Sequence, residues 1–492
     1  MNSRRVLCMG DSLGLIGTPL PTLVKLLARA IANHLGDYAV VVDPAGTSQF
    51  YTSNSIMNLP PTVDMAAVEF EADIIWNTLT PRTVHYLVID HASLSAFVGA
   101  TSAYFDVVTP FTAYAFRFVP QPSNVTSWAL PAGAGRTMPA VVLPANATGN
   151  YGPATFYAID DGWNAPDPPE RDSCRIRLSL AQVNDAASKA LWADVEAATR
   201  ATFERWARTV TWRRVGLSIS GGGAAVFRLV PLFEALEAKQ LPIDLIAGVS
   251  GGTIFAACYA MGGLSKVNDL ANHGLSMSAT FLGALVSSRL VSWYMNRFFD
   301  DCGVCNTEMR MLAFCTALPP VSPPQPTVVV DGTMGDAIRA SGGAPFFAPY
   351  FAGDTRQSDG AVMAGLPPPF VAERFGADIM FAMNVLALPE NRFPGETIPL
   401  VGDVLSLFYR YTPLGRLADT MSATSTMLHT ISEGAGLHAD GFVDAPPRDW
   451  APLEQALFYN SSKYANEGLD GLSPTDLNNI ADQFVLRWRA LP

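Results

Sequence analysis

Short apolar runs alternate with one amphipathic stretch over the first ninety residues of the chain. Val6–Met9, Ala39–Val42 and Val84–Ile89 are such runs. Between the first two, apolar residues recur at three- and four-residue spacing from Leu20 to His34, the period of a helix with one buried face. Apolar runs that alternate with a helix predict an α/β unit. From Phe97 to Asp172 the helical period disappears while proline, glycine and aromatic residues become frequent, so we expect short strands and long loops there.

A helical period returns from Leu180 to Trp206. The tract before it, Asp160–Glu170, is rich in acidic and turn residues and indicates a boundary. We therefore expect an N-terminal α/β domain of unassigned role over residues 1–178. A linking helix is expected over residues 179–212.

Two strand–helix units follow each other directly after Arg214. Val215–Ile219 is expected to be a strand, and a glycine turn leads from it into an amphipathic helix over Ala224–Lys239. Asp244–Val249 is a second buried strand, and a serine–glycine turn leads into a helix of small and apolar residues over Thr253–Met261. Consecutive units of this kind build a parallel sheet.

The remaining pattern completes a second α/β domain. A proline-rich loop at Pro319–Pro326 precedes a helix start at Gly335–Ser341, a helix over Pro369–Phe375 and a strand over Asp378–Leu386. We expect residues 213–492 to form a three-layer domain around a largely parallel central sheet, with a C-terminal helical extension.

Composition and charge narrow the function classes. The chain has 492 residues, of which 49% are hydrophobic and 15% charged, so it has ample apolar surface to bury and is not disordered. Its net charge is −12 and its basic residues are scattered, so we expect no nucleic-acid partner. Six cysteines are too few for a disulfide scaffold, and no signal peptide or transmembrane segment is apparent, so a cytoplasmic setting is expected.

A G-x-S-x-G pentapeptide lies between the second buried strand and its helix. Its residues are Gly248, Val249, Ser250, Gly251 and Gly252. This is the context of a nucleophile elbow, in which small residues let the strand turn sharply and the serine hydroxyl projects at the helix N-terminus. For the pentapeptide alone, an ordinary serine N-cap in a glycine-rich turn is an open alternative.

A glycine turn ends the first of the two strands. Ser220 is followed by Gly221, Gly222 and Gly223, and three successive glycines can aim backbone N–H groups at a developing oxyanion. The alternative is a phosphate-binding turn. Against it, no Lys-Ser/Thr pair follows the glycines, and Val226 occupies the third glycine position of a G-x-G-x-x-G motif.

A third element, Asp359-Gly360-Ala361, would by itself indicate only a turn. Together with the glycine turn and the pentapeptide, it resembles the three ordered motifs of the patatin-like phospholipases, a family of lipid acyl hydrolases. The alanine-rich segment Asp336–Pro345 is also similar to the segment that precedes the aspartate in that family. The resemblance covers the chain from about Trp212 to Leu388.

The resemblance implies a Ser-Asp dyad in which Ser250 is the nucleophile and Asp359 the base, with Gly221, Gly222 and Gly223 as oxyanion donors. A carboxylate of ordinary pKa, roughly 3.9, is a weak base, so Asp359 must lie directly against the serine hydroxyl in a partly desolvated site. The implied function is a serine acyl hydrolase that forms an acyl-enzyme on lipid esters, with phospholipids at a membrane or micelle surface as the favoured substrates. No metal or other cofactor is implied, and a protein or small-molecule activator and the oligomeric state are left open.

Two departures from the family pattern and two alternative functions remain. The N-terminal 200 or so residues have no counterpart in the family's catalytic domain. The family turn continues to an Arg-Gly pair soon after the glycines, whereas here Arg228 comes later and no glycine follows it, which leaves the helix start and the affinity for phosphate open. One alternative is a lipid-binding or partner-activated switch protein with a latent domain. The other is an α/β-hydrolase-type esterase in which His429 or His438 completes a Ser-Asp-His triad.

Two weaker motifs lie outside these elements. Gly10–Leu13 resembles the opening block of GDSL-type esterases, but a later Asp-x-x-His is missing, so a structural turn is favoured. Cys302 and Cys305, with Cys315, form one C-x-x-C without a second pair, so thiols in the core or in loops are favoured over a metal site.

Phe281–Phe299 mixes aromatic and aliphatic residues with Arg289 and Arg297. A core helix is the favoured interpretation. The alternative is a lid or interfacial helix whose aromatic side chains meet acyl chains while the arginines meet lipid phosphates.

Overall fold

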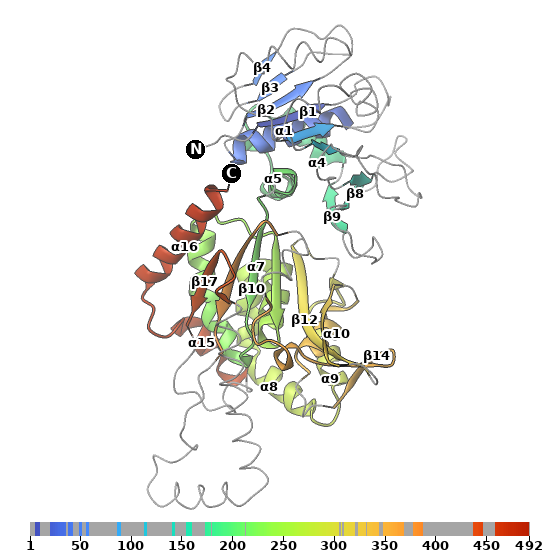
Figure 1. The fold of residues 1–492 in the computed structure, drawn as a ribbon, viewed down its shortest axis with the longest axis vertical. Coiled ribbons are helices and arrows are strands. Elements are labelled where there is room, and N and C mark those ends of the chain that lie inside the picture. Colours follow the sequence, from blue (N-terminus) through green and yellow to red (C-terminus); the bar gives the residue numbers. More distant parts are fainter. Residues whose placement is uncertain are drawn as a thin grey trace, which may run out of the picture. The chain divides into compact units, whose positions relative to one another are not determined.

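The computed structural model divides the chain into two compact units, Met1–Arg213 and Arg214–Leu491 (Figure 1). In the first unit the structure describes the helices and strands named below, with continuous coverage from residue 180 to 211. It also describes residue 213, and in the second unit it describes residues 214–304, 307, 309–319, 323–330, 332–343, 348–368, 377–386, 436–445 and 458–491.

The first unit contains a six-stranded mixed sheet with the order β4-β3-β2-β1-β5-β6. Its strands are β1 (Arg5–Met9), β2 (Tyr38–Val42), β3 (Gln49–Tyr51), β4 (Ile56–Asn58), β5 (Tyr86–Ile89) and β6 (Ala113–Ala115). Strand β1 is parallel to β2 and β5, and α1 (Leu20–Leu35) connects β1 to β2. A separate antiparallel sheet joins β7 (Ala140–Val142), β8 (Ala154–Ile159) and β9 (Ser173–Leu178). This is the α/β arrangement that the alternating pattern predicts.

The single helix expected from Leu180 to Trp206 is instead two helices, and this expectation was wrong. They are α4 (Leu180–Ser188) and α5 (Ala197–Thr211), separated by the short 3-10 helix η2 (Trp192–Asp194). The guanidinium of Arg29 donates to the carbonyls of Lys189 (2.7 Å) and Ala190 (2.6 Å), which occupies oxygens that a continuing helix would use. Buried Trp192 also donates from Nε1 to Glu204 of α5 at 3.1 Å, which favours the break.

The second unit is built on one eight-stranded sheet with the order β14-β15-β12-β11-β10-β16-β17, and β13 pairs with β12 off this path. Its strands are β10 (Val215–Ile219), β11 (Leu245–Val249), β12 (Arg310–Leu318), β13 (Gln325–Val329), β14 (Tyr350–Ala352), β15 (Thr355–Asp359), β16 (Ile379–Asn384) and β17 (Gly441–Asp444). The strands β12, β11, β10, β16 and β17 are mutually parallel, while β13, β14 and β15 are antiparallel to their neighbours. The expected largely parallel sheet is confirmed.

Helices cover both faces of this sheet, so every residue of β10 and β11 is buried and the domain has three layers (Figure 1). The helices described are η3 (Gly223–Leu229), α6 (Val230–Ala238), α7 (Gly251–Asn272), α8 (Gly274–Gly283), α9 (Arg289–Phe298), α10 (Met334–Ser341), η5 (Gly360–Val362), η6 (Phe458–Asn460), α15 (Ser461–Glu467) and α16 (Pro474–Arg489). The C-terminal helix α16 packs on the sheet through Phe484, whose ring stacks on Phe381 of β16 at 4.0 Å between centroids.

Two helix boundaries differ from the sequence expectation. The helix expected over Ala224–Lys239 begins as the 3-10 turn η3, and the α-helical part starts only at Val230, where Pro231 suits the first turn. The helix expected to end at Met261 continues to Asn272 with a kink at Gly262 and Gly263, whose backbone angles are not helical. The helix expected over Pro369–Phe375 lies outside the described residues.

The described helices were compared with the length and hydropathy that a bilayer span requires. None of them is both long enough and apolar enough to cross a membrane.

Candidate active site

Ser250 lies at a sharp turn between β11 and α7. Its backbone angles are φ 52° and ψ −121°, a region that costs a non-glycine residue about 1–3 kcal/mol and persists only where the surroundings enforce it. A Cβ on Gly248 would come within 2.4 Å of the carbonyl carbon of Gly252, so the turn requires glycine there. The side chain of Ser250 makes no capping hydrogen bond to α7, unlike an ordinary serine N-cap. The geometry is that of a nucleophile elbow.

The glycine turn after β10 packs directly against this elbow. A Cβ on Gly251 would lie 2.4 Å from the carbonyl oxygen of Gly223, and one on Gly252 would lie 2.4 Å from that of Ser220. Ser220 is fully buried and holds the turn on β16, because its N–H donates to the Met383 carbonyl (2.9 Å). The turn is therefore fixed beside the serine by contacts that only glycine allows.

The three glycines of the turn have different roles. The N–H of Gly221 donates to the carbonyl of Gly365 at 2.8 Å, so it is already occupied, contrary to its expected role as an oxyanion donor. Gly222 and Gly223 have positive φ angles of 134° and 54°, and their N–H groups donate to no residue that the structure describes. These two N–H groups are the candidate oxyanion donors.

Asp359 ends β15, two strands from Ser250. Asp359 pairs with Cys315 of β12. The preceding residue of β12, Phe314, pairs with Val249 at the end of β11, directly before Ser250. The aspartate is therefore level with the elbow. The Ser250 hydroxyl is close enough to its carboxyl to lower the pKa of that group, and Oδ1 accepts from the N–H of Ala361 at 2.8 Å. The structure thus brings the two residues of the expected dyad together.

The environment of Asp359 raises its basicity. Only 7% of its surface is exposed, and this burial raises the pKa of the carboxyl to about 6 even though the Ala361 N–H and the Ser250 hydroxyl both lower it. The next residue must be glycine, because a Cβ on Gly360 would lie 2.5 Å from the carbonyl oxygen of Phe314. A carboxylate with a pKa near 6 is a stronger base at neutral pH than an exposed one.

Ser341, which the sequence analysis did not select, supports the elbow. It ends α10, is fully buried, and its hydroxyl donates to the carbonyl of Phe314 at 2.6 Å. The same oxygen accepts from the N–H of Ser250 at 3.0 Å and lies 2.6 Å from Oγ1 of Thr253, which is then the donor in that bond. Ser341 therefore fixes the backbone of the strained residue.

The chain just after Ser341 supports the aspartate. The carbonyl of Gly343 accepts from the N–H of Asp359 at 2.9 Å and from the hydroxyl of Ser358 at 3.2 Å. The end of α10 therefore holds both members of the dyad. The only sequence signal for these supporting residues was the similarity of Asp336–Pro345 to the family segment. That similarity did not show which residue of the segment contacts the site.

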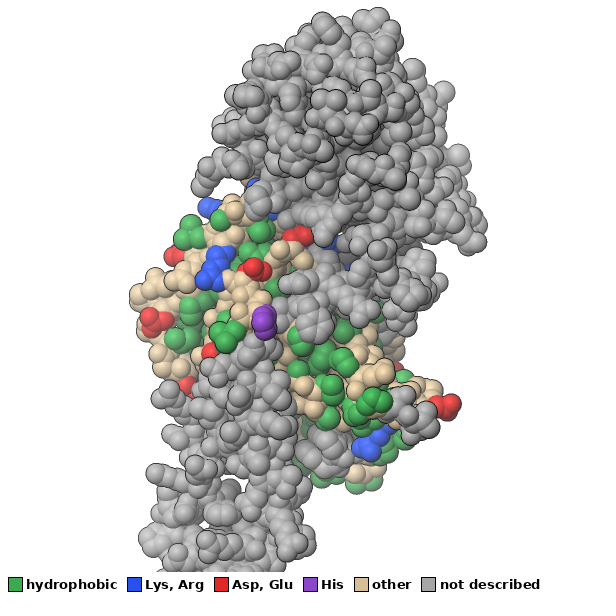
Figure 2. Space-filling view, viewed as in Figure 1, with side chains coloured by type: hydrophobic (Ala, Val, Ile, Leu, Met, Phe, Trp, Pro, Cys, Tyr) green, Lys and Arg blue, Asp and Glu red, His purple; other side chains and the backbone are tan. Residues whose placement is uncertain are grey.

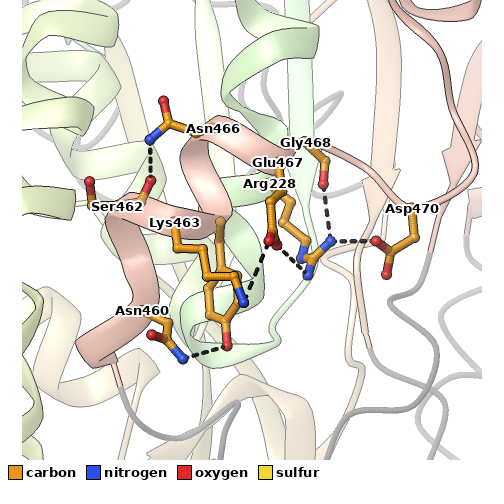
Figure 3. Close-up of polar contacts among 9 residues, drawn as sticks. Arg228, Asn460, Ser462, Lys463, Asn466, Glu467, Gly468 and Asp470 are labelled. Atoms are coloured by element: carbon orange, nitrogen blue, oxygen red, sulfur yellow. Dashed lines mark hydrogen bonds and ion pairs between the residues drawn. The ribbon is translucent and has the colours of Figure 1, made fainter.

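Arg228 is buried and bonded to the C-terminal helical extension (Figure 3). Its guanidinium donates to Glu467 (3.2 Å), to Asp470 and to the carbonyl of Gly468 (3.2 Å), and it lies 5.0 Å from the ring centre of Tyr464. These contacts give Arg228 a structural role, because its guanidinium faces these acceptors.

The histidines of the alternative triad are not brought to the dyad by the described part of the chain. His438 is exposed and lies before β17, which runs parallel to β16, so it is at the amino ends of the strands. Ser250 follows the carboxyl end of β11, at the opposite edge of the sheet. His429 lies outside the described residues.

The cysteines take ordinary positions. The thiol of Cys315 donates to Oε1 of Gln357 at 3.3 Å, and burial raises its pKa to about 12. Cys302 contacts the carbonyl of Gly303, while Cys305 lies outside the described residues, as does Gly10–Leu13. Among the residues that the structure places, no group of three or more His, Cys, Asp or Glu side chains could hold a metal ion.

The segment Phe281–Phe299 is not one core helix. It comprises the end of α8, a turn and α9, which begins at Arg289, and the hydroxyl of Ser288 in the turn accepts from Nε of Arg339 at 2.9 Å. One face is buried, including Val291 and Met295. The other face exposes five large apolar side chains, namely Leu282, Leu285, Val286, Leu290 and Trp293.

Comparison with known proteins identifies similar chains but no matching family model. Lysophospholipase NTE1 of Phaeosphaeria nodorum is 27% identical over 245 residues, which are 47% of this chain and 16% of that protein. Lysophospholipase NTE1 of Yarrowia lipolytica is 25% identical over 292 residues, which are 55% of this chain and 20% of that protein. A patatin-like phospholipase domain-containing protein of Caenorhabditis elegans is 26% identical over 164 residues, which are 26% of this chain and 12% of that protein. The chain thus spans a fifth or less of the length of these relatives.

Proposed function

We propose, from the premise that the chain belongs to the patatin-like phospholipase family, that it is a serine acyl hydrolase of lipid esters. One observation carries this proposal. Ser250 has the strained backbone of a nucleophile elbow, and its hydroxyl lies beside the buried carboxyl of Asp359, whose pKa burial raises to about 6. An ordinary structural serine needs neither feature.

In the proposed reaction Asp359 accepts the proton of the Ser250 hydroxyl while the serine oxygen attacks the ester carbonyl. The negative charge on the carbonyl oxygen is stabilised by the N–H groups of Gly222 and Gly223 and by the positive end of α7. Asp359 then returns the proton to the departing alcohol. Water, deprotonated by Asp359, then attacks the acyl carbon, the bond to the Ser250 oxygen breaks as that oxygen takes the proton back from Asp359, and the fatty acid is released.

The proposed substrates are phospholipids and their monoacyl derivatives. Two of the relatives are named lysophospholipases, which favours a monoacyl glycerophospholipid as the first substrate to test. Arg228 is not available as a headgroup ligand because it bonds to the C-terminal extension, so phosphate recognition would have to come from other residues.

The test is fatty-acid release from lysophosphatidylcholine, from diacyl phosphatidylcholine vesicles and from a soluble acyl ester. Ser250→Ala and Asp359→Asn should both abolish release. Two matched controls, Ser287→Ala in the turn before α9 and Asp354→Asn in the exposed turn before β15, should retain it. The ratio of release from the three substrates separates a lysophospholipase from a diacyl phospholipase and from a general esterase.

The contrasting function, a binding or switch protein with a latent domain, predicts a different result. In that case neither the unmodified chain nor any variant releases fatty acid, although the chain still binds lipid. Release that persists in Ser250→Ala would instead show that another nucleophile acts and would overturn the dyad.

A further inference from the structure

The exposed apolar side chains of Leu282, Leu285, Val286, Leu290 and Trp293 form what we call the α8–α9 surface. Val286 is 87% exposed and Trp293 60%, values unlike those of the buried face of the same two helices. Hydrophobic side chains gather over α9 and β14 on the described surface in Figure 2, with a basic side chain beside them. Isolated exposed apolar residues need no explanation, but a contiguous group marks an interaction site.

The stretch from residue 274 to residue 299 has a charge opposite to that of the protein as a whole, although Asp336 of α10 accepts from the hydroxyl of Ser292 in α9 at 2.7 Å. The chain carries 44 acidic residues and a net charge of −12, yet no Asp or Glu occurs from residue 274 to residue 299. The only charged side chains in that stretch are Arg289 and Arg297, and both are exposed. The guanidinium of Arg297 lies 6.0 Å from the ring centre of Trp293. Acidic residues resume at Asp300, after α9 ends.

The α8–α9 surface is continuous with the segment that carries the candidate base. The N–H of Ala348 donates to the carbonyl of Ala284, in the turn between the two helices, at 3.0 Å. Phe351 follows in β14, which pairs with β15, and is 55% exposed. Val362 and Met363, just after Asp359 in the chain, are exposed as well. Exposed apolar side chains therefore occur both at this turn and in the chain on either side of Asp359.

We propose that the α8–α9 surface docks the protein on a bilayer that contains anionic phospholipid, an inference that rests on the proposed function. Leucine, valine and tryptophan enter the boundary between headgroups and acyl chains, and Arg289 and Arg297 bind lipid phosphates. A second copy of the chain is a poorer occupant, because a two-fold interface brings two copies of the same surface together, and the charged side chains of residues 274–299 are both arginines. Docking in this orientation sets the lipid ester beside Ser250.

The experiment measures binding without hydrolysis, so the full chain carries Ser250→Ala. Two kinds of vesicle are used, phosphatidylcholine alone and an equal mixture of phosphatidylcholine and phosphatidylglycerol. Co-sedimentation with each gives the partition of the protein between vesicle and solution. Val286→Ser/Trp293→Ala should lower the partition roughly tenfold or more, equivalent to about 1.4 kcal/mol. Leu486→Ser, which removes a 65% exposed leucine from α16, is the matched control and should leave the partition unchanged.

Two further variants keep the test independent of folding. Trp293→Phe retains an apolar ring, so the variant should bind vesicles as before. It should lose the part of the tryptophan fluorescence that brominated lipid quenches in the unmodified chain. Arg289→Gln/Arg297→Gln should lose the preference for phosphatidylglycerol and the weakening of binding by salt. Both positions are exposed, so neither change disturbs the core.

Four results would overturn the docking surface. They are absence of vesicle binding, equal binding by the Val286/Trp293 variant, an equal loss in Leu486→Ser, and a dimer of the unmodified chain that this double variant dissociates. Hydrolysis of a soluble ester by the chain with Ser250 intact is measured separately. Hydrolysis without vesicle binding overturns only the docking surface, and binding without hydrolysis overturns only the proposed enzyme.

Discussion

Replacing Ser341 by alanine tests how the elbow is held. The change removes the acceptor for the N–H of Ser250 and the donor to the carbonyl of Phe314, both in a fully buried position. Each buried polar group left without a partner costs about 1–3 kcal/mol, so we expect the free energy of unfolding to fall by about 2–4 kcal/mol. The hydroxyl of Thr253 also loses its partner, which places the loss toward the upper end.

The effect on catalysis follows from the strain at Ser250. Without the bond from its N–H, one of the contacts that hold the φ 52° backbone of Ser250 is lost, and we expect the hydroxyl to shift relative to Asp359. Displacement of a reacting group by about 1 Å can cost on the order of 100-fold in rate, so we expect kcat for a soluble ester to fall about 10- to 100-fold. KM should change little, because Ser341 has no route to the substrate.

Chemical denaturation and steady-state kinetics of Ser341→Ala check both numbers. Ser461→Ala is the matched control, since that serine is also fully buried and donates to a backbone carbonyl, of Phe458 at 2.7 Å. It should lower stability without changing kcat. Ser341→Thr keeps the hydroxyl and should recover part of the rate. Unchanged kcat in Ser341→Ala, or an equal fall in Ser461→Ala, would refute a positioning role.

Three other predictions concern titration, the glycine beside the base and the C-terminal extension. Because the pKa of Asp359 is raised to about 6, the folded protein holds this proton more tightly than the unfolded chain. The contribution of Asp359 to stability is therefore fully present below its ordinary pKa and is lost as pH rises to about 6. Over the upper part of that range kcat/KM should rise, because the carboxylate becomes available as a base. A pH–rate profile with no rise near pH 6 would contradict the assignment of Asp359 as the base. Gly360→Ala should lower the free energy of unfolding by about 2 kcal/mol or more and abolish hydrolysis, because the new Cβ would lie 2.5 Å from the carbonyl oxygen of Phe314. A variant that unfolds at the same temperature as the unmodified chain would contradict this. Arg228→Met should lower the free energy of unfolding by about 2–4 kcal/mol, because Glu467 and Asp470 lose their buried partner. Breaking a buried ion pair typically costs roughly 3–5 kcal/mol. A change below about 1 kcal/mol by denaturant titration would show that other contacts hold the C-terminal extension.

Local sequence features predicted the elbow. Gly248, Gly251 and Gly252 flank Ser250 because their Cβ atoms would meet neighbouring backbone, and this requirement is visible as a motif in one short stretch. The alternating apolar runs likewise predicted the parallel strands β10 and β11. Both are short-range consequences of side-chain size and hydrophobic period.

Contacts between distant segments could not be predicted in the same way. Ser341 lies 91 residues from Ser250, and Asp470 lies 242 residues from Arg228, so neither pairing leaves a pattern in the sequence. The occupation of the Gly221 N–H by Gly365 is of the same kind. These bonds depend on how the sheet and its helices pack, which periodicity does not specify.

Helix ends were also set by tertiary contacts. The break at Lys189 follows from donation by Arg29, which lies 160 residues away. The division of Phe281–Phe299 into two helices, with Ser288 of the turn bonded to Arg339, left no signal in the hydrophobic pattern. Helix propensity is a weak signal at such positions, because long-range hydrogen bonds override it.

The most direct test of the central claim is to trap the nucleophile. A long-chain alkyl fluorophosphonate loses fluoride when an activated serine oxygen bonds to its phosphorus, and the mass of the intact chain and of its peptides locates the adduct. A single adduct on Ser250, absent in Ser250→Ala and formed far more slowly in Asp359→Asn, is the predicted result. An adduct on any other residue, or full-rate labelling of Asp359→Asn, would contradict the dyad.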